Sequence, residues 1–138
     1  MASILVVEDD ALIRLGIVAL LKAEGHCCHQ AATAADAIAL ARTLSPDLML
    51  LDWNLADGSS AREIVTAVGA VAPVILASGT ATAAEAAAVG ALALLPKPFA
   101  SSALRTAVAK ALDPARAHFA SSPRAGHRPR SAALRAAA

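Results

Sequence analysis

Short apolar runs alternate with longer amphipathic segments along the first 112 residues of the chain. Uninterrupted apolar runs are typical of strands that are covered on both faces of a sheet. Apolar residues spaced three or four apart are typical of helices that bury one side. The expected strands are residues 3–7, 26–31, 47–51, 73–77 and 91–95. The expected helices are residues 11–24, 34–44, 59–68, 81–88 and 101–112.

Several residues at the ends of these segments have the chemistry of helix caps and turns. Asp10 and Thr33 precede the first two helices, where a side-chain oxygen can accept backbone N–H bonds. Gly25 follows the first helix, as glycine does after many helices. Asp57 with Gly58 forms a turn signal. We therefore interpret Asp10 as a helix cap and Asp57 as a turn residue, and neither as a metal ligand.

The alternation of strands and helices predicts an α/β fold. Each crossover between parallel strands is right-handed and places its helix on one face, so we expect a five-stranded parallel sheet with helices on both faces. The chain is 57% hydrophobic, and much of that is alanine, which indicates helices that pack through small side chains. Such sheets bind ligands at the carboxyl ends of their strands. The residues directly after the strands are therefore the candidate functional residues.

The two parts of the chain differ in charge. Residues 1–112 hold 7 Lys and Arg against 10 Asp and Glu, a net −3, whereas residues 113–138 hold 5 Arg against 1 Asp, a net +4. The second part is rich in Ala, Arg and Pro without a sustained apolar stripe. We therefore expect a domain over 1–112 and a disordered basic tail over 113–138. Basic tails attract nucleic acid, but Phe119 is the tail's only aromatic residue for base stacking, so we expect no nucleic-acid partner.

The sequence shows no feature of export or membrane insertion. Met1 leads directly into a strand, without a basic segment or a cleavage site, and no apolar run is long enough to cross a bilayer. We therefore expect a cytoplasmic protein with no membrane contact, in which Cys27 and Cys28 stay reduced. Side chains alternate along a strand, so Cys27 and His29 share one face. Residues 26–29 are thus expected to form an ordinary strand with small buried thiols, and not a metal cluster.

Charged side chains follow three of the expected strands. Glu8 and Asp9 follow the first strand, Asp52 follows the third, and Lys97 follows the fifth. Carboxylates gathered at one edge of a sheet repel one another when they are ionised. They need a divalent cation, and hard oxygen ligands select Mg²⁺ or a similar ion. This set of residues predicts metal-dependent phosphate chemistry.

Asp52, Ser78 and Lys97 have side chains suited to phosphoryl transfer. A carboxylate can ligate a metal or attack phosphorus as a nucleophile, and an ammonium neutralises charge on the phosphoryl oxygens. Lys97 stands between two prolines, which restrict the direction of its side chain. Pro98 is suited to a cis peptide bond. Ser78, after the fourth strand, offers a hydroxyl donor to a phosphoryl oxygen.

Four short segments at the strand ends form an ordered set. They are Val6-Val7-Glu8-Asp9-Asp10, Leu51-Asp52-Trp53-Asn54-Leu55, Ala77-Ser78-Gly79 and Lys97-Pro98-Phe99. This set resembles the receiver domain of two-component response regulators over about residues 1–112. The resemblance implies a flavodoxin-like, or receiver, (βα)5 fold with strand order 2-1-3-4-5.

The resemblance also implies a phosphoryl-acceptor site. By this resemblance, Asp52 is expected to accept a phosphoryl group from a histidine kinase or a histidine phosphotransfer protein. Glu8 and Asp9 hold Mg²⁺ (or Mn²⁺) together with Asp52, and Asn54 supplies a backbone carbonyl to the ion.

Four further positions take their meaning from the same resemblance. By this resemblance, Ser78 is expected to be the switch hydroxyl that moves toward the phosphate, Lys97 to bind the phosphate, and Thr80 to stand at a position that tunes self-dephosphorylation. Leu94 stands where the family has a switch aromatic in the fifth strand. The protein is accordingly expected to be no enzyme but a phospho-accepting signalling domain that assists its own phosphorylation and dephosphorylation.

The leading interpretation is a single-domain response regulator that signals through protein–protein contacts or a phosphorelay. Its downstream protein is unidentified, and a homodimer is an open alternative. A second interpretation is a pseudo-receiver, a binding module of the same fold that does not switch, which Leu94 favours. A third is a small α/β enzyme, but Glu8-Asp9-Asp10 stands where a haloacid-dehalogenase-type phosphatase has Asp-x-Asp. Arg14 is either part of the surface that docks histidine donors or a plain surface arginine.

Overall fold

The computed structural model describes residues 1–113, in which five strands and five helices alternate. The strands are β1 (Ser3–Val7), β2 (Cys27–Ala31), β3 (Leu48–Asp52), β4 (Val74–Ser78) and β5 (Ala93–Pro96). The helices are α1 (Ala11–Ala23), α2 (Ala34–Leu44), α3 (Ala61–Val68), α4 (Ala83–Ala88) and α5 (Ser101–Leu112). Among these described residues, no helix has the length and apolar character needed to cross a bilayer.

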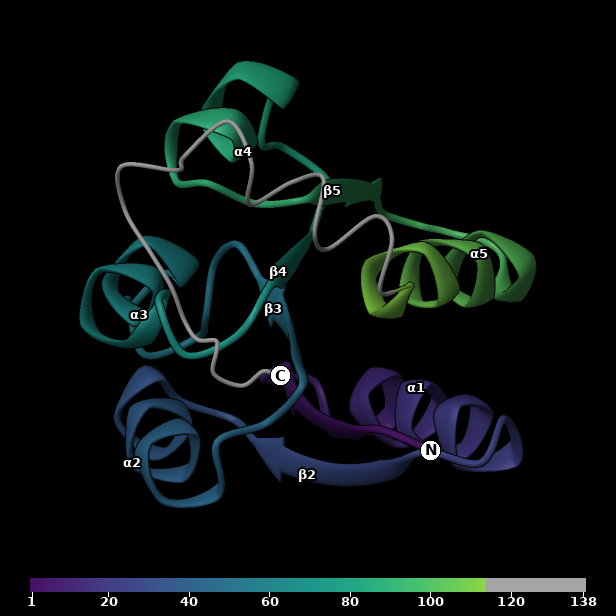
Figure 1. Cartoon of the computed structure of the whole chain (residues 1–138). Helices are drawn as coiled ribbons and strands as arrows, with labels where there is room; N and C mark the ends of the chain where they lie inside the picture. The colour runs from purple at the N-terminus through teal and green to yellow at the C-terminus, as the bar shows by residue number, and fades with distance from the viewer. Residues whose placement is uncertain (114–138) are drawn as a thin grey trace.

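The five strands form one parallel sheet in the order β2-β1-β3-β4-β5. This result confirms the predicted α/β fold and the strand order that the resemblance implied. The chain leaves β1 toward β2 on one side and returns to β3 on the other, as Figure 1 shows. The direction of winding therefore changes between β1 and β3, and open α/β sheets bind their ligands at such a point.

Helices cover both faces of the sheet. α1 and α5 lie on one face, and α2, α3 and α4 lie on the other (Figure 1). The first face is buried largely by branched residues, among them Ile17, Leu21, Leu104 and Val108. The second is buried to a large extent by alanines, among them Ala37, Ala41 and Ala61, which are fully buried. The helices α2 and α3 thus pack on the sheet largely through small side chains, as the composition predicted.

The predicted caps are confirmed at the first two helices. Asp10 accepts hydrogen bonds from the N–H groups of Leu12 and Ile13 at 2.9 and 3.1 Å. Thr33 accepts one from the N–H group of Asp36 at 3.2 Å. These side chains satisfy donors that have no partner inside the helix. The start of each helix, and hence the end of the strand before it, is fixed by these local contacts.

Several predicted boundaries were off by one or two residues. Asp52 and Ser78 are the last residues of β3 and β4, where the prediction placed them just after the strands. Helix α4 begins at Ala83 and not at residue 81, because Thr82 and Glu85 form a capping box at its start. The ladder of backbone hydrogen bonds, which apolar patterning does not reveal, sets where each strand ends.

The prediction of buried thiols in residues 26–29 was wrong. Cys27 is exposed and Cys28 is only half-buried, because β2 is an edge strand that pairs with β1 alone. The predicted alternation of faces is confirmed. Cys27 Sγ lies 3.9 Å from His29 Nε2, whereas Cys28 packs with the apolar core on the α1 side.

The predicted tail over residues 113–138 lies, apart from Asp113, outside the described residues. Its predicted disorder and the domain boundary at 112 therefore stay predictions. The last described helix ends at Leu112.

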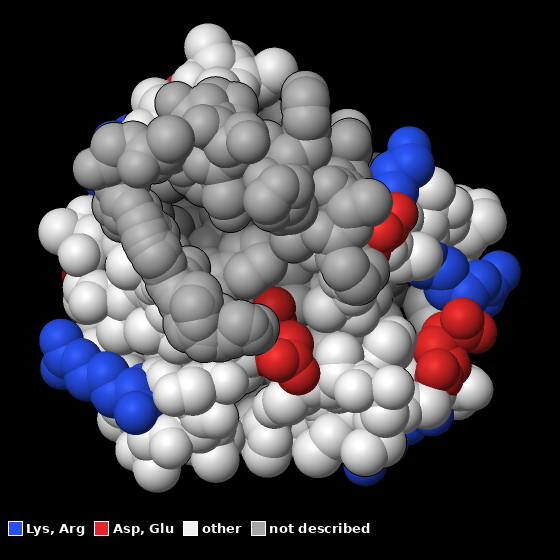
Figure 2. Space-filling view, in the orientation of Figure 1, with Lys and Arg blue, Asp and Glu red and all other residues white. Residues whose placement is uncertain are grey.

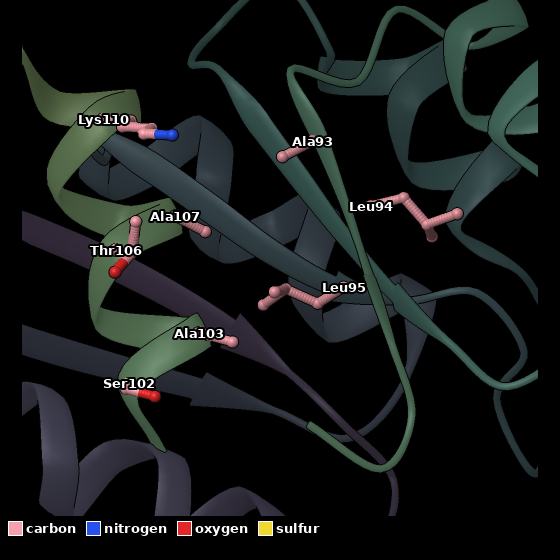
Figure 3. Close-up of a pocket in the computed structure, with 8 residues that line it drawn as sticks. All are labelled: Ala93, Leu94, Leu95, Ser102, Ala103, Thr106, Ala107 and Lys110. Atoms are coloured by element: carbon pink, nitrogen blue, oxygen red, sulfur yellow. The ribbon is translucent and has the colours of Figure 1, made fainter. Parts of the chain in front are cut away.

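A shallow groove of about 440 Å³ separates β5 from α5 (Figure 3). Ala93 and Leu95 point toward α5 in this view, whereas Leu94 points away from it. Leu94 is half-buried and packs with the core on the side of α4. The residue at the position of the missing aromatic is thus part of the core. None of the acidic residues at the strand ends lines the groove.

Candidate functional site

The strand order brings the predicted site residues to one edge of the sheet. Val7 pairs with Leu51 in the ladder between β1 and β3, so Glu8 and Asp52 follow side by side. Lys97, which follows β5, lies beside the end of β4, because its N–H group donates to the Ser78 carbonyl at 2.8 Å. The Lys97–Pro98 peptide bond is cis, as predicted.

The ammonium of Lys97 bridges two of the three acids. Lys97 Nζ lies 2.7 Å from Glu8 Oε1 and 3.2 Å from Asp52 Oδ1. The side chains of Glu8 and Asp52 are only 4% and 10% exposed, and that of Lys97 is 24% exposed. Ion pairs that are shielded in this way interact more strongly than pairs on the surface. Lys97 therefore serves as a counter-charge for both Glu8 and Asp52.

Glu8, Asp9 and Asp52 each offer a carboxylate oxygen, and the three oxygens lie within 4.8 Å of one another. One ammonium balances one of three negative charges, so the ionised site keeps an excess of negative charge. Burial raises the pKa of Asp52 to about 7, the nearby Glu8 adds to this increase, and Lys97 opposes it. Burial disfavours the Lys97 ammonium, but the hydrogen bond to Glu8 and the charge of Asp52 outweigh burial and raise the pKa of Lys97.

The three carboxylates fit a divalent cation. All three donors are hard oxygens, which Mg²⁺ and Mn²⁺ prefer over softer ligands. Opposite ligands of an octahedral Mg²⁺ are about 4 Å apart, so oxygens within 4.8 Å of one another are close enough to share one ion. The excess negative charge of the site adds to the attraction. The acidic cluster could therefore bind a metal.

Ser78 lies at the same edge, and its hydroxyl holds the start of the next loop. Ser78 Oγ accepts hydrogen bonds from the N–H groups of Thr80 at 3.0 Å and of Ala81 at 2.8 Å. Thr80 Oγ1 lies 3.4 Å from the same oxygen. Ser78 is buried, whereas Thr80 is exposed. The hydroxyl of Ser78 is thus used by the loop between β4 and α4 in this structure.

The loop after β3 carries Trp53 and Asn54. Trp53 is half-buried, and the guanidinium of Arg62 lies 5.6 Å from the centre of its ring. Asn54 is exposed and forms an isolated bridge with Ser60. Asn54 follows Asp52 by two positions in the chain. The predicted role of its carbonyl in metal binding stays a prediction.

Arg14 has contacts that the sequence did not predict. Its Nη1 atom donates to the backbone carbonyl of Glu8 at 2.7 Å, and its Nε atom donates to Gln30 Oε1 at 3.1 Å. Both expectations for Arg14 concerned the outer surface of the first helix, whereas the side chain is half-buried and reaches back to β1. The signal that could have revealed these contacts was spacing, because an arginine at the end of the first turn of a helix can reach the end of the preceding strand.

Charged side chains are sparse on the face seen in Figure 2. Those of the described residues that are visible there form small red and blue groups, with no extended basic patch among them.

The model of the response regulator receiver domain matches residues 4–109. The chain belongs to the response regulator receiver family. Members of this family are signalling modules that accept a phosphoryl group. A receiver domain in general implies a kinase as its partner. The match begins one residue into β1, includes the other four strands and ends within α5. No curated protein matches the chain.

Solved receiver structures share the fold. Chemotaxis protein CheY4 of Vibrio cholerae is 28% identical with a TM-score of 0.75, over 81% of this chain and 99% of that one. A CheY-like receiver domain protein from Methanospirillum hungatei is 26% identical with a TM-score of 0.76, over 82% and 94%. NtrX from Brucella abortus is 27% identical with a TM-score of 0.76, over 88% of this chain but 29% of its own. The fold thus occurs both as most of a chain and as part of a longer one.

Proposed function

We propose that this receiver accepts a phosphoryl group on Asp52 and acts as a single-domain response regulator. The observation that carries the proposal is the bridge from Lys97 to Glu8 and Asp52, with Asp9 beside them. This arrangement combines a carboxylate nucleophile, a cation for the phosphoryl oxygens and an acidic pocket for a metal. No second folded unit lies within residues 1–113.

Mg²⁺, or Mn²⁺ in its place, would be held by Glu8, Asp9 and Asp52, with the Asn54 carbonyl as a further ligand. When bound, the ion neutralises charge on the phosphoryl oxygens. Lys97 is close enough to Asp52 to pair with a phosphoryl group there, since its Nζ atom already lies 3.2 Å from Asp52 Oδ1. The Lys97 ammonium would then exchange a carboxylate partner for a phosphoryl oxygen.

The proposed transfer is a displacement at phosphorus. One carboxylate oxygen of Asp52 forms a bond to phosphorus while the bond from phosphorus to the donor's imidazole nitrogen breaks. The electron pair of the broken bond stays on the imidazole. The ionised form of Asp52 is the nucleophile, so its raised pKa makes the metal-free site a poor acceptor below about pH 7.

Ser78 is the proposed switch residue, and switching would change the hydrogen bonds that its hydroxyl accepts in this structure. To reach a phosphoryl oxygen, Ser78 Oγ would give up the N–H groups of Thr80 and Ala81. The loop before α4 then loses its acceptor and changes shape, which supplies two states whose balance phosphorylation shifts. Thr80, which is exposed at the start of this loop, is the proposed position that tunes dephosphorylation.

The histidine kinase or phosphotransfer protein is proposed to dock on the start of α1. Leu12, Ile13 and Leu15 are 82%, 43% and 53% exposed there, close in sequence to the acids of the site. Exposed apolar side chains that cluster on a surface indicate contact with another protein. The downstream protein is proposed to read the loop before α4 by direct contact.

A pseudo-receiver remains the second candidate because of Leu94. Leu94 is packed in the core beside α4 and has no polar group or ring with which to report the position of Ser78. A phosphorylation-independent module would keep the fold and lose the response of the acidic site. The following measurement separates the two candidates.

The test is to incubate the protein with acetyl phosphate and Mg²⁺ and to measure the mass of the intact protein by mass spectrometry. The wild type is expected to gain one phosphoryl group, and Asp52→Asn is expected to gain none. Asp36→Asn, which removes a carboxylate from the exposed start of α2, is the matched control and is expected to be labelled like the wild type. Labelling of Asp52→Asn to the same extent, or of neither protein, would contradict the proposal.

A further inference from the structure

Arg14 connects three elements at the end of the sheet that carries the acids. It belongs to α1, its Nη1 atom donates to the Glu8 carbonyl at the end of β1, and its Nε atom donates to Gln30 on β2. The rigid, planar guanidinium presents these donors in a fixed relative orientation. The contact at 2.7 Å is short, as expected when the donor is charged.

The backbone of Glu8 is held on both sides as a result. Its N–H group donates to the Ala31 carbonyl at 3.1 Å, and its carbonyl accepts from Arg14. The Glu8 carboxylate is held as well, by Lys97 at 2.7 Å and by the Asp10 N–H group at 3.2 Å. Since β1 ends at Val7, the strand ladder does not supply the partner of the Glu8 carbonyl. Arg14 takes its place.

The carbonyl of Glu8 belongs to the peptide unit that leads into Asp9. A bond to this carbonyl therefore fixes the rotation of that peptide plane, and with it the direction in which Asp9 leaves the backbone. Asp9 is less buried than Glu8 and Asp52, so packing constrains it less. Of the three acids, Asp9 thus depends most on its backbone for its position.

We infer that Arg14, anchored by Gln30, is a positioning residue that sets Asp9 and Glu8 for metal binding. This inference rests on the proposed function, because it concerns the metal that the acidic cluster would hold. Residues that orient metal ligands through hydrogen bonds typically affect affinity by about 10- to 100-fold. The role belongs to this chain's own contacts and needs no direct contact between Arg14 and the ion.

The test is a titration with Mg²⁺ that measures its affinity for the protein. The signal is the fluorescence of Trp53, the single tryptophan of the chain. Arg14→Met keeps the apolar stem but removes all donors, and it is expected to weaken Mg²⁺ binding about tenfold. Gln30→Met leaves Arg14 in place but removes its anchor, and about a three- to fivefold loss is expected. Arg42→Met removes the same charge from an exposed position in the last turn of α2 and is expected to bind like the wild type.

Phosphorylation by acetyl phosphate separates positioning from a general loss of structure. At Mg²⁺ well above the new dissociation constant, Arg14→Met is expected to recover the labelling rate of the wild type, because only the metal site was disturbed. Small donors also bypass protein docking on α1, so a docking defect cannot produce the result. Arg14→Lys, which keeps one charged donor for the Glu8 carbonyl, is expected to restore part of the affinity.

The outcomes are distinct. Equal Mg²⁺ affinity in Arg14→Met, Gln30→Met and Arg42→Met would overturn the positioning role while leaving the proposed function intact. A wild type without a saturable Mg²⁺ response would overturn both. If Arg14→Met does not fold, Gln30→Met decides alone, and wild-type affinity in that variant would overturn the role.

Discussion

Lys97 Nζ lies 2.7 Å from Glu8 Oε1, although the two residues are 89 positions apart in the chain. Lys97 follows the last strand, and Glu8 follows the first. The pair joins the two ends of the folded unit at one edge of the sheet and places a positive charge beside Asp52. The acidic site therefore depends on the ends of β1, β3 and β5 lying together in one sheet.

Removal of this charge should destabilise the metal-free protein. We expect Lys97→Met to lower the free energy of unfolding by about 2 kcal/mol near pH 7.5, because two shielded carboxylates lose their common partner. Saturating Mg²⁺ should reduce the difference, since the cation supplies the missing charge. Urea unfolding with EDTA and with Mg²⁺ measures both effects.

Lys110→Met is the matched control for this experiment. Lys110 lies in the last turn of α5 and is exposed, so its loss should change the free energy of unfolding by less than about 0.5 kcal/mol. A similar loss in both variants, or a deficit in Lys97→Met that Mg²⁺ leaves unchanged, would contradict the bridging role.

The stability of the metal-free protein should fall as the pH rises. The pKa of Asp52 is raised to about 7 in the folded state, above its usual 3.8. Between about pH 4 and pH 7 the folded state therefore holds a proton that the unfolded chain releases, and the stabilisation from this proton is lost across that window. The shift corresponds to at most about 4 kcal/mol.

Asp52→Asn should remove this dependence. The amide is neutral at every pH, so the free energy of unfolding of the variant should rise relative to that of the wild type as the pH rises. The variant should be the more stable protein at pH 8 in EDTA. Urea unfolding at several values between pH 5 and pH 8 measures the difference. Parallel stability curves for the two proteins would show that Asp52 does not titrate in this window.

Ser78→Ala should weaken the loop before α4. Ser78 Oγ is the acceptor for the N–H groups of Thr80 and Ala81, and loss of the acceptor should cost about 1–2 kcal/mol of unfolding free energy. Thermal or urea unfolding measures the loss. Thr80→Val, which removes only the contact at 3.4 Å, should cost less than about 0.5 kcal/mol. Equal effects in the two variants would show that the hydroxyl of Ser78 does not hold the loop.

Docking of a histidine donor on α1 can be separated from chemistry. We expect the double variant Leu12→Ala, Leu15→Ala to slow transfer from a phosphorylated histidine protein by about tenfold, because two exposed apolar contacts are lost. Labelling by acetyl phosphate and the free energy of unfolding should stay near their wild-type values. Leu44→Ala, at an apolar residue of α2 that is 37% exposed, is the control. Undiminished transfer in the double variant would place the docking surface elsewhere.

Local features of the fold could be read from the sequence because they depend on neighbouring residues. Apolar runs predicted β1, β3, β4 and β5, the alternation of strands and helices predicted β2, and the caps at Asp10 and Thr33 were confirmed atom by atom. The exposure of Cys27 was not predictable in this way. It depends on β2 being an edge strand, and a strand's place in the sheet is decided by distant segments.

The sequence by itself determined the type of chemistry, since acids and a lysine directly after strands fall at one edge of any parallel sheet. Tertiary structure decided which of them touch. The register of β1 with β3 set Glu8 beside Asp52, the bond from Lys97 to Ser78 brought the ammonium to both, and the fold of α1 against β1 turned Arg14 toward the Glu8 carbonyl. The pattern of apolar and polar residues indicates which face of an element is buried and where the element ends. The distances of 2.7 and 3.2 Å from Lys97 Nζ to Glu8 and Asp52 depend on how the elements pack together.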